Sequence, residues 1–185
     1  ILHELRKLNE NDILIYVDAG CELNKYGREK FTEYLTYTET NNALLFELDH
    51  KFRVWTKSLE SLTGDPENHL RNQLVAGVVF IRKTPETMAF VQSWLDLCCE
   101  DDFAALKDPL PTEPQIPEFV AHRHDQSCLS ATAYKFGLKT RPDETYFRNW
   151  RDAASYPILA LRSRSGRSKL GKVFWFLRLK EKFGI

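Results

Sequence analysis

Side chains that can do chemistry concentrate in two short segments of the chain. In the first, Tyr16 to Glu22, Asp18 ends a short apolar run and is followed by Ala19 and Gly20. A carboxylate at the carboxyl end of a strand lies where open α/β sheets bind their ligands, and glycine lets a backbone approach closely. An aspartate that only caps a turn is the alternative. We favour a ligand-binding role because so apolar a strand should present its carboxylate at the rim of a sheet.

The second segment joins a loop to a predicted helix and is rich in charged and proton-transferring groups. It comprises His122, Arg123, His124, Asp125 and Gln126. Backbone N–H groups at a helix N-terminus favour anions, and arginine and histidine suit phosphate charge. An ordinary capped helix with a polar surface is the alternative, but the density of functional groups favours a site.

Gly77 forms a third and weaker pattern, because it interrupts the apolar segment Gln73–Arg82. A glycine inside a strand indicates that a ligand or another backbone comes close. A glycine needed only for packing explains the pattern equally well.

The elements that position these segments alternate between helices and strands. Strands are predicted at 12–18, 43–48 and 73–82, and helices at 1–8, 84–99 and 124–136. The run at 12–18 is so apolar that we expect a central strand buried on both faces. Thr84 and Pro85 mark a helix start, since threonine caps a helix and proline fits its first position. Such alternation predicts an α/β domain with a mostly parallel sheet flanked by helices.

Length and composition fit one globular domain. The chain has 185 residues, of which 43% are hydrophobic and 28% charged, and this argues against disorder. Four cysteines lack the spacing of a zinc site or disulfide framework, and no apolar run approaches the roughly 20 residues that cross a bilayer. We therefore expect a cytoplasmic protein with reduced thiols.

Charge is distributed unevenly along the chain. Eight Lys or Arg residues against Glu181 alone give residues 161–185 a net charge of +7, which leaves −7 on the preceding residues. We expect a main domain at 1–165 and a basic amphipathic helix at 166–185. The stretch 168–185 matches a helix that lies on an anionic membrane surface, although packing against the acidic domain is the alternative. An acidic main domain argues against nucleic acid as a partner.

Three segments, DILIYVDAGCELN, QLVAGVVFIRKTPETMAFVQSWLDLC and HRHDQSCLSATAYKFGL, follow one another along the chain. In this order they resemble glycosyltransferases of the nucleotide-diphospho-sugar transferase superfamily, which have the GT-A fold. The resemblance covers about residues 1–165 and is closest to members with a Tyr-x-Asp-Ala-Gly segment. It implies transfer of a sugar from a nucleotide-sugar donor to a glycan or lipid-linked acceptor. It also implies that this chain lacks most of the N-terminal nucleotide-binding half, because one helix alone precedes the acidic motif.

The resemblance assigns roles to individual residues. Asp18 matches the first aspartate of the family's Asp-x-Asp motif, which contacts the nucleotide sugar and a divalent metal, usually Mn²⁺ or Mg²⁺. Gly20 stands where the second aspartate is expected, so Glu22 is the candidate substitute ligand. Ala76 and Gly77 match the small residues that border the donor sugar.

Asp125 with Gln126 resembles the family's acidic position near the sugar and the acceptor. We therefore predict Asp125 and His124 as catalytic groups, with Asp125 either taking a proton or orienting sugar hydroxyls. The predicted donor-binding residues are Asp18, Ala19, Gly20, Ala76, Gly77, His122, Arg123 and Gln126. Which histidine faces the diphosphate stays open.

Three other functions compete with this prediction. A degenerate, non-catalytic module that binds a glycan or nucleotide would account for the missing second aspartate. A membrane adaptor would use the basic tail. A phosphatase of the haloacid-dehalogenase type also has an apolar strand that ends in a nucleophilic aspartate. That family needs a second aspartate where this chain has Gly20, so we rank it low.

Overall fold

The computed structural model describes residues 1–48, 63–64, 71–115, 117, 119–148 and 151–160. Within them, a four-stranded sheet has the order β1–β4–β3–β5. Its strands are β1 (Ile13–Val17), β3 (Ala43–Glu47), β4 (Leu74–Arg82) and β5 (Thr140–Pro142). A separate small sheet pairs β2 (Glu22–Leu23) with β6 (Ile158–Leu159). Together with the flanking helices, this sheet confirms the predicted α/β class.

The strand directions correct the prediction of a mostly parallel sheet. β4 runs antiparallel to both of its neighbours, β1 and β3, whereas β3 and β5 pair in parallel. β1, β3 and β5 therefore point the same way, and the carboxyl end of β1 meets the amino-terminal part of β4. An apolar run indicates that a strand is buried but does not indicate the direction in which it pairs.

β1 also differs from the central, doubly buried strand that its sequence predicts. It lies at an edge of the sheet within the described part of the chain. Ile15 and Tyr16 in the middle of β1 are 36% and 38% exposed. Among the described strands, β1 pairs with β4 along one of its two edges only, so the residues near the carboxyl end of β1 remain accessible to a ligand.

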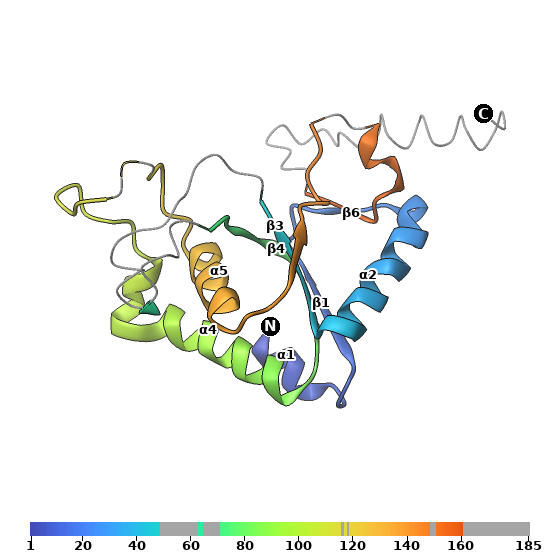
Figure 1. The fold of residues 1–185 in the computed structure, drawn as a ribbon, viewed down its shortest axis with the longest axis horizontal. Coiled ribbons are helices and arrows are strands. Elements are labelled where there is room, and N and C mark those ends of the chain that lie inside the picture. The colour runs from blue at the N-terminus through green and yellow to red at the C-terminus, as the bar shows by residue number, and fades with distance from the viewer. Residues whose placement is uncertain (49–62, 65–70, 116, 118, 149–150, 161–185) are drawn as a thin grey trace.

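Helices cover both faces of the sheet (Figure 1). One face carries α1 (Leu2–Lys7), α4 (Pro85–Phe103) and α5 (Asp125–Lys135), and the other carries α2 (Arg28–Asn41). Short 3₁₀ helices connect these elements: η1 (Lys25–Gly27), η3 (Ala104–Leu106) and η4 (Asp152–Ser155). The result is a three-layer arrangement in which α5 begins near the end of the sheet that carries the candidate residues.

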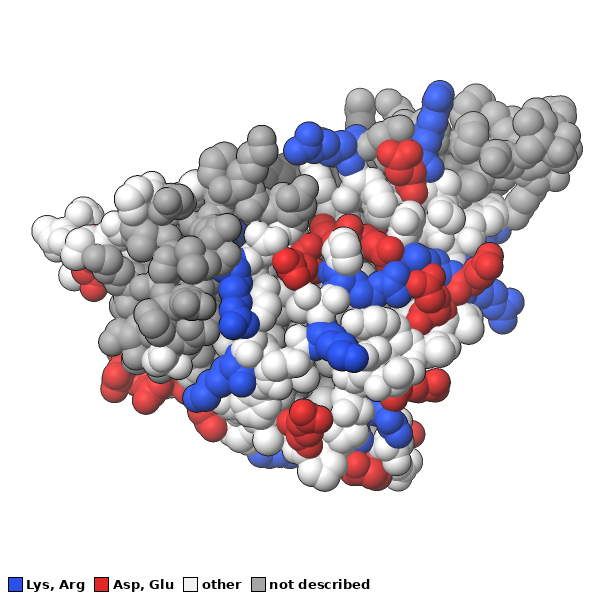
Figure 2. Space-filling model, viewed as in Figure 1, with Lys and Arg blue, Asp and Glu red and all other residues white. Residues whose placement is uncertain are grey.

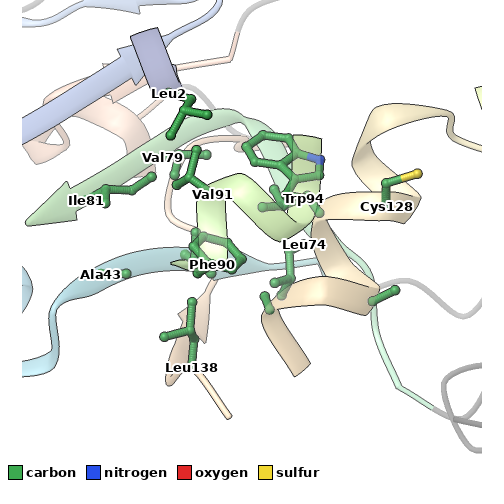
Figure 3. Packing of buried hydrophobic residues seen from close by; sticks show 14 of the residues in the cluster. Leu2, Ala43, Leu74, Val79, Ile81, Phe90, Val91, Trp94, Cys128 and Leu138 are labelled. Carbon is green, nitrogen blue, oxygen red and sulfur yellow. The ribbon is translucent and has the colours of Figure 1, made fainter. Parts of the chain in front are cut away.

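Two hydrophobic clusters join the three layers, because successive residues of a strand face opposite sides of a sheet. On the α4 side, Val79 of β4 packs in one cluster with Phe90 of α4 (Figure 3). On the α2 side, the Tyr34 ring meets the rings of Phe46 and Phe80 edge-on, at centroid distances of 5.3 and 5.8 Å. β3 and β4 each contribute to both clusters, so these two strands connect the layers.

Helix α4 begins where the sequence predicts. The Thr84 hydroxyl accepts a hydrogen bond from the Thr87 N–H, and the Thr87 hydroxyl accepts one from the Thr84 N–H. This reciprocal cap satisfies two N–H groups that the helix itself leaves unpaired. α5 ends just before Gly137, whose φ of +64° suits the residue that follows a helix.

Charged side chains of both signs are interspersed on the face of the molecule shown in Figure 2. Among the described residues, no helix is both long and apolar enough to cross a membrane. The predicted basic helix at 166–185 lies outside the described residues. Contact with an anionic membrane surface through this helix therefore stays a prediction.

Replacing Phe90 with alanine tests the larger cluster. Phe90 is fully buried, and its ring meets those of Trp94 and Phe136, so we expect Phe90→Ala to lower the free energy of unfolding by about 3–5 kcal/mol. Leu95→Ala is the matched control, because Leu95 lies on the same helix and is 44% exposed. Leu95→Ala should lower the free energy of unfolding by no more than about 1 kcal/mol. Urea unfolding followed by circular dichroism measures both variants, and equal losses would contradict this packing.

Candidate functional site

A cavity of about 290 Å³ lies where β1 ends and β4 begins. Its wall comes from three segments that are far apart in the sequence: the residue after β1, the early part of β4, and the turn that leads into α5. The lining residues are Asp18, Ala76, Gly77, His122, Arg123, His124, Asp125 and Gln126. All of them belong to the set predicted from the sequence, so the fold brings the separately chosen segments together at one place.

Asp18 is held closely against β4. Its N–H donates to the Gly77 carbonyl at 2.8 Å, one residue beyond the end of β1. The Tyr16 hydroxyl donates to Asp18 Oδ1 at 2.7 Å. A Cβ atom at position 77 would lie 2.7 Å from Asp18 Oδ2. Glycine at this position therefore leaves the space that the carboxylate occupies.

The Tyr16 hydroxyl is a group at the site to which the sequence assigned no role. Residues two apart on a strand project from the same face, and this spacing was the available signal for its contact with Asp18. The hydrogen bond to Asp18 raises the pKa of Tyr16 to about 12; burial and the negative charges of Asp18 and Asp125 act in the same direction. At neutral pH the phenol therefore stays protonated and keeps donating to Asp18.

Two histidines anchor the turn before α5 to the residues of η3. His122 Nε2 lies 2.9 Å from the Ala105 carbonyl, and His124 Nδ1 lies 2.8 Å from the Leu106 carbonyl. A carbonyl oxygen can only accept, so each of these ring nitrogens carries the proton. In the uncharged ring, His124 therefore keeps Nε2 as an acceptor for a proton of a ligand.

The two histidines differ in burial. His122 is 5% exposed, and its Nδ1 has no hydrogen-bond partner among the described residues. Burial lowers the pKa of His122 below its usual value and outweighs the opposing effect of the hydrogen bond to Ala105. His122 is therefore uncharged at neutral pH and brings no positive charge to a diphosphate. His124 is exposed and is the more accessible of the two.

The start of α5 is strained. His124 is its N-cap and has a φ of 52°, a conformation that costs a non-glycine residue on the order of 1–3 kcal/mol. The contact with Leu106 and a hydrogen bond from Trp94 Nε1 to the Asp125 carbonyl, 3.2 Å long, help to hold it. Asp125 is exposed in the first turn of α5, where the positive end of the helix dipole stabilises a negative charge.

A buried chain of polar groups ties β4 to the same turn. Gln73 is 1% exposed; it accepts a hydrogen bond from Gln126 Nε2 at 2.6 Å and donates one to Ser127 Oγ at 3.0 Å. The Ser127 oxygen also accepts from the Arg123 N–H at 3.2 Å. Gln73 therefore positions two cavity residues without lining the cavity. A polar residue at the start of an apolar strand is its one signal in the sequence.

Three predicted residues do not line the cavity. Ala19 and Gly20 form the exposed turn after Asp18, which the Cys21 N–H closes with a 2.9 Å hydrogen bond to the Asp18 carbonyl. Glu22 lies in β2, which pairs with β6 rather than with the main sheet. This short strand carries Glu22 out of the cavity wall that contains Asp18.

Asp18 and Asp125 are the carboxylates among the described residues that line the cavity. Within the described segments, no group of three or more His, Cys, Asp or Glu residues is arranged to hold a metal ion. Mg²⁺ is often bound by one or two protein carboxylates together with the phosphates of a substrate. A metal ion at Asp18 would therefore be bound by this carboxylate together with the phosphates of a ligand. The described residues do not supply enough protein ligands to enclose a metal ion by themselves.

A larger cavity, of about 410 Å³, is lined mainly by residues of α4 and α5. Among its described lining residues, the charged ones are Asp96, Glu100 and Lys135, and none is shared with the cavity at Asp18. These described residues include no histidine and no glycine at which a backbone could approach a ligand. We assign the candidate site to the smaller cavity because its groups can transfer protons and bind phosphate.

Comparisons of the chain with protein-family models, curated proteins and solved structures gave no match. The resemblance to glycosyltransferases therefore rests on the three sequence segments that carry it. The shared cavity is an independent observation, because it depends on the fold and not on the choice of motifs.

The pKa of Tyr16 should report on the position of the Asp18 carboxylate. We expect Tyr16 to lose its proton near pH 12 and Asp18→Asn to bring that pKa back towards about 10, because the charged acceptor is lost. Since the pKa is raised in the folded state, the stabilising contribution of Tyr16 is complete below about pH 10. It is lost as the pH rises towards 12.

Ultraviolet difference absorbance between the wild type and Tyr16→Phe measures this phenol separately from the other tyrosines. Gly77→Ala should also lower the Tyr16 pKa, because its Cβ would displace the Asp18 carboxylate. Gly20→Ala is the matched control, since nothing lies within 4 Å of its added Cβ. A wild-type Tyr16 pKa near 10 would show that the contact with Asp18 is not made.

Proposed function

We propose that this protein is a glycosyltransferase that moves a sugar from a nucleotide-sugar donor to a glycan or lipid-linked acceptor. The observation that carries the proposal is the convergence of Asp18, the backbone at Ala76–Gly77 and the 122–126 turn on one cavity. Open α/β sheets bind ligands outside the carboxyl ends of their strands, which is where Asp18 lies.

In this proposal the phosphates of the donor bind at the start of α5. Arg123 is the one Lys or Arg among the described residues that line the cavity. The start of α5 adds the positive end of the helix dipole, whereas the N–H groups of Gln126, Ser127 and Cys128 already donate to the Arg123 and His124 carbonyls. Negative charge builds up on the nucleotide diphosphate as it leaves, and groups placed in advance to meet that charge accelerate the transfer. Asp18 would hold Mn²⁺ or Mg²⁺ together with the diphosphate.

The proton of the acceptor hydroxyl would go to His124 or Asp125. A general base needs an acceptor atom that is not already engaged and that can reach the substrate. His124 meets this condition through Nε2, because Nδ1 is the atom that donates to Leu106. The exposed carboxylate of Asp125 meets it as well. Gln126 lines the cavity beside them and can bind a sugar hydroxyl.

A non-catalytic module that binds a glycan or nucleotide is the second candidate. Gly20 occupies the position where the resemblance leads us to expect a second metal-binding aspartate. Glu22, the candidate substitute, lies in β2 and not in the cavity wall. Such a module would bind a nucleotide sugar in the same cavity without transferring the sugar, so binding and turnover have to be measured separately.

Thermal unfolding of the full-length protein measures binding. We expect nucleotide diphosphates and nucleotide sugars to raise the melting temperature, and Mn²⁺ to increase the effect, because a ligand of the folded state stabilises it. Asp18→Asn should remove the contribution of Mn²⁺. Glu10→Gln, an exposed residue outside the cavity, should leave the shift unchanged. No shift with any nucleotide, with or without metal, would contradict the proposal.

Turnover distinguishes the two candidates. If His124 or Asp125 is the base, then His124→Gln or Asp125→Asn should lower the rate of sugar transfer about 10²- to 10⁴-fold while nucleotide binding persists. Asp96→Asn on α4, outside the cavity, serves as the charge-matched control. A wild type that binds nucleotide sugars but never transfers or hydrolyses them would support the non-catalytic module. Unchanged rates in both variants would rule out these residues as the base.

A further inference from the structure

Two carboxylates and one basic residue, Arg123, are the charged groups among the described residues that line the candidate cavity. Neither Asp18 nor Asp125 forms an ion pair with a Lys, Arg or His in the described part of the chain. Some acidic groups elsewhere are paired, as Glu33 is with Arg141 at 2.6 Å. Once an anionic group has engaged Arg123, the cavity is therefore unfavourable for a further negative charge, since like charges repel most strongly where water is partly excluded.

The neighbouring polar groups add further acceptors. Gln126 uses Nε2 to donate to Gln73, which leaves its Oε1 as an acceptor. His124 uses Nδ1 to donate to Leu106, so Nε2 of the uncharged ring is an acceptor too. The buried His122 adds no positive charge. Apart from Arg123, the side chains that a ligand meets in this cavity are thus mainly hydrogen-bond acceptors.

These acceptors are held in place. The Tyr16 hydroxyl and the absence of a side chain at Gly77 define where the Asp18 carboxylate lies. The Trp94 indole fixes the backbone of Asp125 through its carbonyl. Groups that are already positioned discriminate between ligands better than groups that can move aside, because moving them costs free energy.

From this arrangement we infer that the cavity takes a neutral sugar, whose hydroxyl groups donate to these acceptors, and discriminates against a sugar that carries a carboxylate. A hydroxyl both donates and accepts, whereas an ionised carboxylate only accepts. The inference rests on the proposed function, in which Arg123 is engaged by the diphosphate and Asp18 by the metal, so that Asp125 is the carboxylate that repels an acidic sugar. It goes beyond that function by naming the class of sugar.

Matched pairs of nucleotide sugars test the inference on the full-length protein. UDP-glucose against UDP-glucuronate, and GDP-mannose against GDP-mannuronate, differ only in the charge and oxidation state of one carbon. Titration calorimetry with and without Mn²⁺ gives the ratio of the two dissociation constants in each pair. We expect the neutral sugar to bind at least tenfold more tightly, equivalent to about 1.4 kcal/mol.

Substitution of Asp125 tests whether the charge of its carboxylate causes the preference for the neutral sugar. Asp125→Asn keeps the shape of the side chain and removes the repulsion, so the preference for the neutral sugar should fall several-fold. Glu10→Gln removes one negative charge at an exposed position outside the cavity. It should leave the ratio unchanged, which controls for the overall charge of the protein.

The outcomes separate this inference from the proposed function. If a uronate binds as tightly as its neutral partner, or if Asp125→Asn leaves the ratio unchanged, the inference is wrong while the proposed function stands. If neither the nucleotide diphosphates nor any nucleotide sugar binds, the proposed function fails and the inference fails with it.

Discussion

The candidate site depends on one backbone contact, the 2.8 Å hydrogen bond from the Asp18 N–H to the Gly77 carbonyl. It exists because β4 runs antiparallel to β1, which places the early part of β4 beside the end of β1. The contact brings the Asp18 carboxylate into space that a side chain at position 77 would fill. Strand direction and the absence of a Cβ atom together define one wall of the cavity.

The same strand also positions the opposite wall. Gln73, just before β4, joins Gln126 and Ser127 through its buried amide, and β4 packs through both hydrophobic clusters. Core packing thus maintains a turn whose N-cap, His124, has an unfavourable backbone conformation. β4 therefore carries one wall of the cavity, and Gln73 at its start anchors the other through hydrogen bonds.

Local features of this fold could be predicted, and pairings between distant segments could not. Thr84 and Pro85 mark the start of α4 by themselves, and the density of polar groups at 121–127 indicates a site without any tertiary information. The apolar run of β1 does not specify its partners, so it was expected at the centre of the sheet and lies at an edge. The hydrogen bonds of Gln73 span 53 and 54 positions, and no local pattern encodes them.

A crystal structure of the full-length protein with the nucleotide sugar that stabilises it most would show where the donor binds. We expect the sugar in the cavity between Asp18, Gly77 and Asp125, with the diphosphate near Arg123 at the start of α5. A nucleotide sugar bound elsewhere, with this cavity empty, would show that the cavity is not the donor site.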